Sequence, residues 1–357
     1  MVSWTRRAAL AASLALLALA PAAHANGGPP PDVTVMSRNI YLGGDIFRPI
    51  GAPDRAEFER QAGLLWREVQ QTNFPFRSKL LAREVQRKQP DLIGLQEVAL
   101  WRRGPQGVKD GATTPATRVV YDFLAILRSQ LRRRGLDYRV AVKQREADIE
   151  APIDAGYDVR LTMRDVILVR NRPGLRVTRT RSANYTADIS VPTPAGAVTS
   201  TRGWTAVDAT LSGHRFRFVN THLESALDSV RVAQAAELVG PGGPLRVRKP
   251  MILVGDFNSD PEGRGGNAAG AYDLIEGAGF SDVWPRAHPN ADGLTFGFNS
   301  DLSNSSAAGF TARIDLIWTK PRLRVLRASI VGKRRSDRRR GLWPSDHAGV
   351  VAELRLR

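Results

Sequence analysis

The chain has 357 residues, no cysteine, and 52 lysines and arginines against 35 aspartates and glutamates, which gives a formal net charge of +17 at pH 7. The absence of cysteine excludes a disulfide-stapled scaffold and a lipid attached to cysteine, so stability has to come from a hydrophobic core. The basic charge favours polyanionic partners such as nucleic acid, anionic lipid headgroups or wall polymers. An arginine-rich composition at solvated positions explains it equally well.

The first 25 residues have the pattern of a secretory signal peptide. Arg6 and Arg7 precede an apolar run over residues 8–21, and the Ala-His-Ala tripeptide at residues 23–25 offers a cleavage site. The run is short for a membrane span, which needs about 20 apolar residues. We expect a secreted protein that is cleaved near Ala25. Export would follow either the general or the twin-arginine route. Loss of the two arginines takes its net charge from +17 to +15.

The rest of the chain predicts a leader followed by one α/β domain. Residues 26–32, rich in Gly and Pro, are expected to form a flexible leader, and residues 33–357 the catalytic domain. Alternating apolar patterns predict strands at residues 33–40, 91–96, 138–143, 166–170, 204–211, 214–221, 250–255, 313–319 and 348–356. Helical spacing predicts helices at residues 55–71, 78–88, 119–133 and 229–239, and residues 101–117, 145–161 and 183–201 are expected to be irregular. Single helices between more numerous strands favour a large mixed sheet or a pair of sheets, without a transmembrane segment in the mature chain.

Polar residues interrupt or end these apolar strands at recurring places. They are Ser37-Arg38-Asn39, Gln96-Glu97, Asn220-Thr221-His222, Asp256-Phe257-Asn258, Asp315 and Ser345-Asp346-His347. Because an unpaired buried charge is costly, we expect these side chains to converge on one crevice and to share a cation or a proton there. Carboxylate and amide oxygens are the ligands that Mg²⁺ takes. The sequence has neither the Cys/His spacing of a zinc site nor a G-x-S-x-G or Walker motif.

Taken in order, these motifs resemble those of the endonuclease/exonuclease/phosphatase superfamily, which includes pancreatic deoxyribonuclease, abasic-site endonucleases and neutral sphingomyelinases. The resemblance covers residues 33–356, and Gly255-Asp256-Phe257-Asn258 together with Ser345-Asp346-His347 carry it most specifically. It implies an α/β (α+β) fold, a four-layer α/β/β/α sandwich of two packed mixed sheets flanked by helices. It also implies a divalent cation, Mg²⁺ or another such as Mn²⁺ or Ca²⁺, and a phosphodiester substrate.

The resemblance also implies a role for each matching residue. Catalytic roles fall to His222, Asp256, Asn258, Asp315 and His347, metal binding to Asn39, Glu97 and Asp346, and phosphate binding to Asn258 and His222. His347 resembles the general base or a phosphate-contacting imidazole, with Asp315 as its orienting partner. These residue types suit the chemistry independently, because phosphodiester hydrolysis needs an attacking water, a base, and positive charge for the developing oxyanion.

Other polar residues fit the pattern less clearly. Arg160, Arg164 and Asp165 either line the phosphate site or, in the interpretation we favour, form a structural salt-bridge cluster. Residues 41–76 are long for a link between the first two motifs and are expected to form a lobe at the rim of the site. Four residues outside the motifs are expected to be ordinary surface or loop residues: His214, His288, Asp282 and Asp301.

The substrate is less constrained than the reaction. The leading expectation is a monomeric nuclease acting on extracellular DNA or RNA, with the basic run at residues 320–340 contacting phosphates. That run also fits a solvated loop. A phospholipid phosphodiesterase of the sphingomyelinase type would insert exposed aromatic residues into a membrane surface, and Trp101, Trp284 and Trp343 lie in expected loops. A small-molecule phosphatase, and a binding module that has lost the chemistry, are the remaining alternatives.

Overall fold

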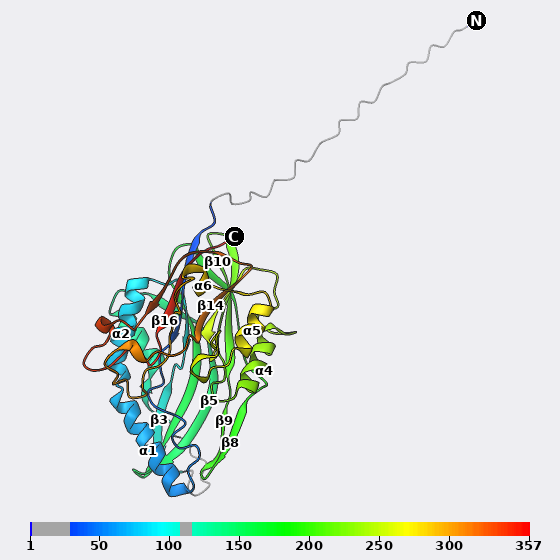
Figure 1. The fold of residues 1–357 in the computed structure, drawn as a ribbon. Helices are drawn as coiled ribbons and strands as arrows, with labels where there is room; N and C mark the ends of the chain where they lie inside the picture. The colour runs from blue at the N-terminus through cyan, green and yellow to red at the C-terminus, as the bar shows by residue number, and fades with distance from the viewer. Residues whose placement is uncertain (2–28, 108–115) are drawn as a thin grey trace.

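The computed structural model describes Met1 and residues 29–107 and 116–357 (Figure 1). Apart from Met1, the expected signal peptide lies outside the described residues, and so does the first part of the expected leader. Among the described residues, no helix combines the length and the apolar character that a membrane span needs.

The first sheet has eight strands. Its order is β15 (Arg324–Val331), β16 (Gly349–Arg355), β1 (Asp32–Asn39), β2 (Leu92–Gln96), β6 (Tyr157–Arg170), β3 (Leu100–Pro105) and β4 (Arg118–Asp122), with β5 (Tyr138–Ile153) paired to β6. β1 and β2 are parallel and therefore need a crossover connection, which helices α1 (Arg55–Gln71) and α2 (Phe74–Lys88) supply. Asn73 separates the two helices in a left-handed conformation, so the prediction of two successive helices is confirmed, although α2 begins four residues earlier than expected.

The second sheet has six strands. Its order is β13 (Ser281–Asp282), β14 (Asp315–Lys320), β12 (Met251–Asp256), β11 (His214–His222), β10 (Gly203–Leu211) and β7 (Leu175–Asn184). β11 and β12 are parallel, and α4 (Asp228–Val239) makes their crossover. The other helices are α3 (Phe123–Arg132), α5 (Gly270–Gly277) and the short α6 (Trp284–Ala287).

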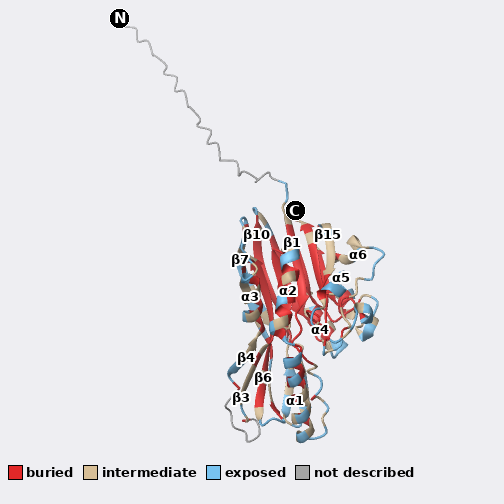
Figure 2. Cartoon of the chain, turned by 90° about the vertical axis from the view of Figure 1, so that its left-hand side faces the viewer, coloured by how far each residue is buried: buried red, intermediate tan, exposed pale blue. Residues whose placement is uncertain are grey.

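The two sheets pack face to face, and helices cover both outer faces. Figure 1 shows α2 on one side of the sheets and α4 and α5 on the other. Between the sheets, Val35 and Ile167 of the first sheet share a fully buried cluster with Phe218 and Val254 of the second. Figure 2 shows the buried residues concentrated in these central strands. The predicted four-layer α/β/β/α sandwich is confirmed.

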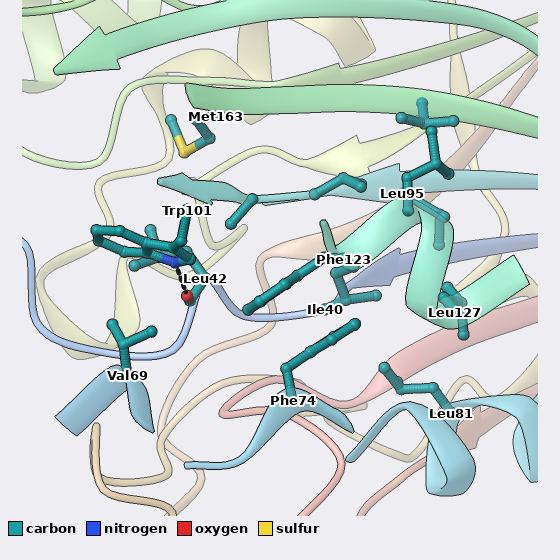
Figure 3. Close-up of a cluster of buried hydrophobic side chains, with 14 of the residues drawn as sticks. Ile40, Leu42, Val69, Phe74, Leu81, Leu95, Trp101, Phe123, Leu127 and Met163 are labelled. Carbon is teal, nitrogen blue, oxygen red and sulfur yellow. Dashed lines mark hydrogen bonds between the residues drawn. The ribbon is translucent and has the colours of Figure 1, made fainter. Parts of the chain in front are cut away.

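A cluster of aliphatic and aromatic side chains fills the space between the first sheet and its helices (Figure 3). The rings of Phe74 in α2 and Phe123 in α3 stack with 3.6 Å between their centroids. The indole Nε1 of Trp101 donates a hydrogen bond to the carbonyl oxygen of Leu42 at 2.9 Å, so this buried ring carries no unsatisfied donor. The segment that follows β1 is thereby tied to the start of β3.

The expectation of irregular structure is wrong in three places. Residues 145–161 lie largely in β5 and β6, whose far ends, with α1 and the hairpin of β8 (Ile189–Thr193) and β9 (Gly196–Ser200), form a lobe beyond the sandwich (Figures 1 and 2). A bulge between Arg145 and Asp148 breaks the apolar alternation of β5. The hairpin lies within residues 183–201, and β3 lies at the start of residues 101–117, of which residues 108–115 are outside the described part. The basic run is likewise no simple loop, because it contains β15.

Several residues expected in loops are buried instead. Trp101 and Trp343 are 2% and 0% exposed. Neither offers an aromatic ring to a membrane surface. Asp282, expected in a loop, lies in β13 and forms a buried ion pair with Arg313 at 2.5 Å, because the charge of Arg313 needs a partner where β14 begins.

Candidate active site

Strand register brings the predicted residues to one edge of both sheets. In the first sheet, Asn39 ends β1 opposite Gln96, which ends β2. In the second sheet, Asp256 at the end of β12 lies opposite both His222, at the end of β11, and Asp315, at the start of β14. β14 runs antiparallel to β12, so its start meets the ends of the two parallel strands.

The two sheets approach each other closely beside this edge. Nε2 of Gln96 donates to Oδ1 of Asn220 at 2.5 Å, and Nδ2 of Asn220 donates to the carbonyl oxygen of Leu95 at 3.2 Å. Gly94 permits this approach, because a Cβ atom there would collide with the side chain of Asn220. These contacts fix the functional residues of one sheet relative to those of the other.

Asn39 connects two of the predicted carboxylates. Its Nδ2 donates to Oε1 of Glu97 at 2.8 Å and to Oδ2 of Asp256 at 3.0 Å, while its Oδ1 accepts from the backbone amide of Tyr41 at 2.9 Å. The other oxygen of Glu97 accepts from the amide of Leu42 at 2.8 Å. In this arrangement Asn39 holds the two carboxylates side by side.

His347 lies at the centre of a group of carboxylates. Its Nδ1 is 2.9 Å from Oδ2 of Asp315, and its Nε2 is 3.7 Å from Oδ2 of Asp256 and 4.0 Å from Oδ1 of Asp346. Burial alone would lower the pKa of His347, but the three carboxylates outweigh it and raise this pKa to about 10. The ring is therefore an imidazolium at neutral pH in the absence of a metal ion.

Burial has the opposite effect on the neighbouring acids. It raises the pKa of Asp256 to about 7, with His347 opposing the shift and Asp315 adding to it. Burial also raises the pKa of Asp346 to about 6, again opposed by His347 and reinforced by Glu97. Carboxyl groups held this close together strongly attract a cation.

The carboxylates fit a divalent metal ion. Carboxylate oxygens of Glu97 and Asp256 and a ring nitrogen of His347 lie within 4.8 Å of one another. A protonated His347 has no lone pair for a metal ion, so Glu97 and Asp256 are the residues of this group that would hold one, and carboxylate oxygens are ligands that Mg²⁺ or Mn²⁺ takes. Of the predicted metal ligands, Glu97 belongs to this group, while Asp346 lies beside it and Asn39 holds two of the carboxylates together.

Asn258 is placed by a tight turn after β12. Its backbone φ is +48°, and its amide donates to Oδ1 of Asp256 at 3.0 Å. Its Nδ2 donates to the carbonyl oxygen of Leu223, just after β11, at 2.9 Å. An asparagine side chain tolerates the left-handed conformation, which explains the residue type at this turn.

Sequence reasoning missed Arg202. This guanidinium is 3% exposed, and its Nη1 lies 3.1 Å from Nδ1 of His222. Since arginine only donates, Nδ1 of His222 accepts and Nε2 carries the hydrogen, directed at Oδ2 of Asp256 3.4 Å away. Burial, Arg202 and His347 together lower the pKa of His222 well below its usual value, so this imidazole is neutral. The available signal was an arginine just before the strand that pairs with β11.

The partners of the arginines in β6 decide whether these residues bind phosphate or form structural salt bridges. Arg160 pairs with Asp148 at 2.7 Å, and Arg164 donates to Asp122 at 2.7 Å, so the favoured structural role is confirmed for both. Asp165 is different. It is fully buried near His222 and Glu146, and burial raises the pKa of both acids, that of Glu146 to about 8.

One cavity of about 240 Å³ is lined by Glu97, Arg202, His222, Asp256, Asn258, Asp346 and His347, whereas Asn39 and Asp315 are not among the residues that line it. Residues 44–47 of the expected lobe also line this cavity. The prediction of a lobe beside the site is thus confirmed. The ring of Phe296 lies 4.7 Å from that of His347, centroid to centroid, and belongs with Leu42, Ile46, Phe47, Met163 and Phe298 to the apolar part of the lining.

The chain resembles known proteins in sequence and in fold. The sequence profile of the Endonuclease/Exonuclease/phosphatase family matches residues 68–347, whereas no curated protein matches the chain. A family protein from Leptotrichia buccalis is similar in structure, with a TM-score of 0.57, 15% identity, and 91% of this chain and 100% of the other covered.

Two further structures of defined proteins share the fold. One is a mannosyl-6-phosphatase from Bacteroides thetaiotaomicron, with a TM-score of 0.51, 20% identity and coverage of 90% and 99%. The other is D. rerio TDP2 complexed with single-strand DNA product, with a TM-score of 0.52, 15% identity and coverage of 90% and 98%. The family profile spans most of the chain. Within the matched region, predicted site residues lie at one cavity whose carboxylates suit a metal ion. The protein is therefore a metal-dependent phosphoester hydrolase that belongs to the endonuclease/exonuclease/phosphatase family.

Proposed function

We propose that the protein is an exported phosphodiesterase that uses a divalent metal ion. One observation carries the proposal: His347, held by Asp315 behind it, and the carboxylates of Asp256 and Glu97 line the same cavity as the neutral imidazole of His222. This set supplies a proton acceptor, hydrogen-bond donors and a cation site within one space, which is what phosphodiester hydrolysis needs.

The residues divide the reaction between them. An attacking water forms a bond to phosphorus, the bond from phosphorus to the leaving alcohol breaks, and the leaving oxygen takes up a proton. Asp256 is placed to accept the proton of the water, with Asn258 beside it. His347, as an imidazolium held by Asp315, donates to a phosphoryl oxygen, and Nε2–H of His222 donates to the phosphate or to the leaving oxygen. A bound divalent ion supplies positive charge and lowers the pKa of water.

Nucleic acid is one of the polyanions that the net charge would attract as substrate. A mature charge of +15 attracts any polyanion, and TDP2, which shares the fold, has been crystallised with a DNA product. Against this, Arg202 is the one Lys or Arg among the described residues that line the cavity. The basic run would have to act at a distance from the reacting phosphate.

A substrate panel tests the reaction and the preference together. Purified protein is incubated with plasmid DNA, RNA, sphingomyelin, mannose 6-phosphate and bis(p-nitrophenyl) phosphate, each with Mg²⁺ and with a chelator. We expect Mg²⁺-dependent turnover of the chromogenic diester, abolished by His347→Ala and retained by the matched control His288→Ala, which lies outside the cavity. Absence of metal-dependent turnover on every substrate would refute the proposal.

Export rests on the N-terminal pattern alone and is tested separately. The full chain is expressed in a bacterial host, and the mass of the protein outside the cytoplasm is measured. We expect the mature chain to begin at Asn26. Replacing Arg6 and Arg7 with lysines distinguishes the routes, because a twin-arginine signal depends on that pair. A protein that stays in the cytoplasm at full length would contradict export.

A further inference from the structure

A second cavity, of about 80 Å³, opens beside the catalytic one. Both cavities are lined by Ile46, Phe47, Met163 and Arg202, so they adjoin across these four residues. The residues that line the second cavity come mainly from the loop after β1, helix α1, strands β5 and β6, and the β8–β9 hairpin. Figure 1 shows these elements together in the lobe. We refer to it as the side cavity.

The walls of the side cavity are apolar. They include Phe58 and Leu65 from α1, Ile149 and Leu161 from β5 and β6, Val198 from β9, and Trp101. Among the described residues that line it, Ser200 and Arg202 are the two with a hydroxyl or charged side chain. Both are already paired with Glu224, at 3.0 Å and 3.4 Å. A polar group placed in this cavity would lose its hydration without gaining a partner.

The volume of the side cavity restricts its occupant further. A protein cavity of about 150 Å³ lined by similar residues holds a benzene ring. A space of about 80 Å³ is too small for that ring but accepts the narrower cross-section of an aliphatic chain. Phe47, which is 47% exposed, belongs to both cavities and places an apolar surface along the path between them.

We propose that the side cavity binds an aliphatic chain of the phosphoester whose phosphate is hydrolysed in the catalytic cavity. The inference rests on the proposed function and adds the substrate class: an ester of phosphate with an alcohol that carries a hydrocarbon chain. A nucleoside does not fit, because its base is larger than the cavity and its polar edges would find no partners there.

A series of alkyl p-nitrophenyl phosphodiesters tests this directly. The leaving group stays constant while the other ester group is methyl, ethyl, butyl or hexyl, and thymidine 5′-(p-nitrophenyl) phosphate and phenyl p-nitrophenyl phosphate are included. Because each buried methylene contributes about a fourfold gain in binding, kcat/KM should rise by about that factor per methylene and level off once the cavity is full. The thymidine and phenyl diesters should fall below the butyl diester.

A variant that fills the side cavity gives an independent measurement. Ala151→Leu places a branched aliphatic side chain in the cavity from β5, and we expect it to lower the hexyl-to-methyl ratio of kcat/KM by at least tenfold. Val119→Leu, at a site 55% exposed in β4 and outside the cavity, is the matched control and should leave this ratio unchanged. Circular dichroism and the thermal midpoint show whether each variant folds, and the wild-type series decides the question even where Ala151→Leu does not fold.

The outcomes separate the two proposals. If wild-type protein with Mg²⁺ hydrolyses none of the diesters, the proposed phosphodiesterase function fails. If it hydrolyses the methyl ester and kcat/KM is independent of chain length, or if the thymidine or phenyl diester is the best substrate, the reaction stands and the aliphatic-chain inference is overturned.

Discussion

Nδ1 of His347 lies 2.9 Å from Oδ2 of Asp315, and both side chains are almost completely buried. Asp315 opens β14, whereas His347 precedes β16 in the other sheet, so this contact crosses the sandwich. The other oxygen of Asp315 has no hydrogen-bond partner among the described residues. The Asp315 carboxylate therefore interacts through one oxygen with the imidazole of His347, and this contact fixes both the orientation of the ring and its positive charge.

Replacing Asp315 with asparagine should separate this effect from simple folding. We expect kcat to fall by about 10²–10⁴-fold, because the imidazole loses its orienting partner and part of its charge. The raised pKa of about 10 keeps wild-type His347 protonated below that pH, so losing Asp315 lowers the pKa and moves the alkaline limb of the pH–rate profile to lower pH. Asp301→Asn, in an exposed loop, is the control. An unchanged alkaline limb would show that Asp315 does not act through His347.

Glu97 is the carboxylate whose loss should affect the metal ion most directly. Glu97→Gln removes a negative charge and keeps the size of the side chain, although its single amide oxygen can accept from only one of the two donors, Asn39 and Leu42. Mutating a residue that only hydrogen-bonds to a metal ligand typically lowers metal affinity by about 10- to 100-fold. For Glu97 itself we therefore expect the Kd for Mn²⁺ to rise by at least about tenfold. Calorimetric titration measures it, with Glu57→Gln on the outside of α1 as control. Excess Mg²⁺ should partly restore activity, and an unaltered Kd would place the ion elsewhere.

The sequence predicted the central strands well because their interiors are almost continuously apolar and their polar ends stand out. His222, Asp256 and Asp315 are recognisable for this reason, and register then places them opposite one another. Arg202 lacks such a contrast. It lies in a stretch with Ser, Thr and Gly, and one of its two acidic neighbours, Glu146, lies far away in the chain, in a strand whose sequence looks irregular.

The side cavity was beyond sequence reasoning for a different reason. Phe58 and Val198 have the apolar character expected of any core residue, and no pattern along the chain shows that they border a space rather than each other. That outcome depends on how far the lobe's α1 and β8–β9 stand apart, which is set by contacts between elements that are distant in the sequence. Packing distances of this kind follow from tertiary structure alone.

Arg38 links the core to the site and should affect both. It is 1% exposed, its Nε donates to Glu84 at 2.9 Å, and its Nη1 donates to the carbonyl oxygen of His347 at 2.7 Å. Arg38→Met leaves Glu84 buried without its partner, and we expect a loss of about 3–5 kcal/mol in the free energy of unfolding. The double variant Arg38→Met/Glu84→Met should recover much of this stability.

Activity then distinguishes the two roles of Arg38. The double variant still lacks the donor to the His347 carbonyl, so we expect its kcat to stay below that of the wild type after stability is recovered. Urea denaturation gives the stability and steady-state kinetics the kcat. Arg67→Met, which breaks the more exposed pair with Asp154, is the control and should have a much smaller effect. Full recovery of kcat in the double variant would limit Arg38 to a role in folding.

The neutral state of His222 should appear in the acid dependence of stability. Its folded pKa is lowered by burial, Arg202 and His347, whereas in the unfolded chain it takes up a proton near pH 6.5. Below pH 6.5 the unfolded state therefore binds more protons, and this group costs up to about 1.4 kcal/mol of stability per pH unit. His347, with its raised pKa, is protonated in both states there and adds no slope. Comparing urea unfolding of metal-free wild type and His222→Gln at pH 7.5 and pH 5.5 isolates the contribution, because other acids cancel in the difference. We expect the wild type to lose more stability than the variant on acidification; equal losses would mean that His222 is already charged in the folded protein.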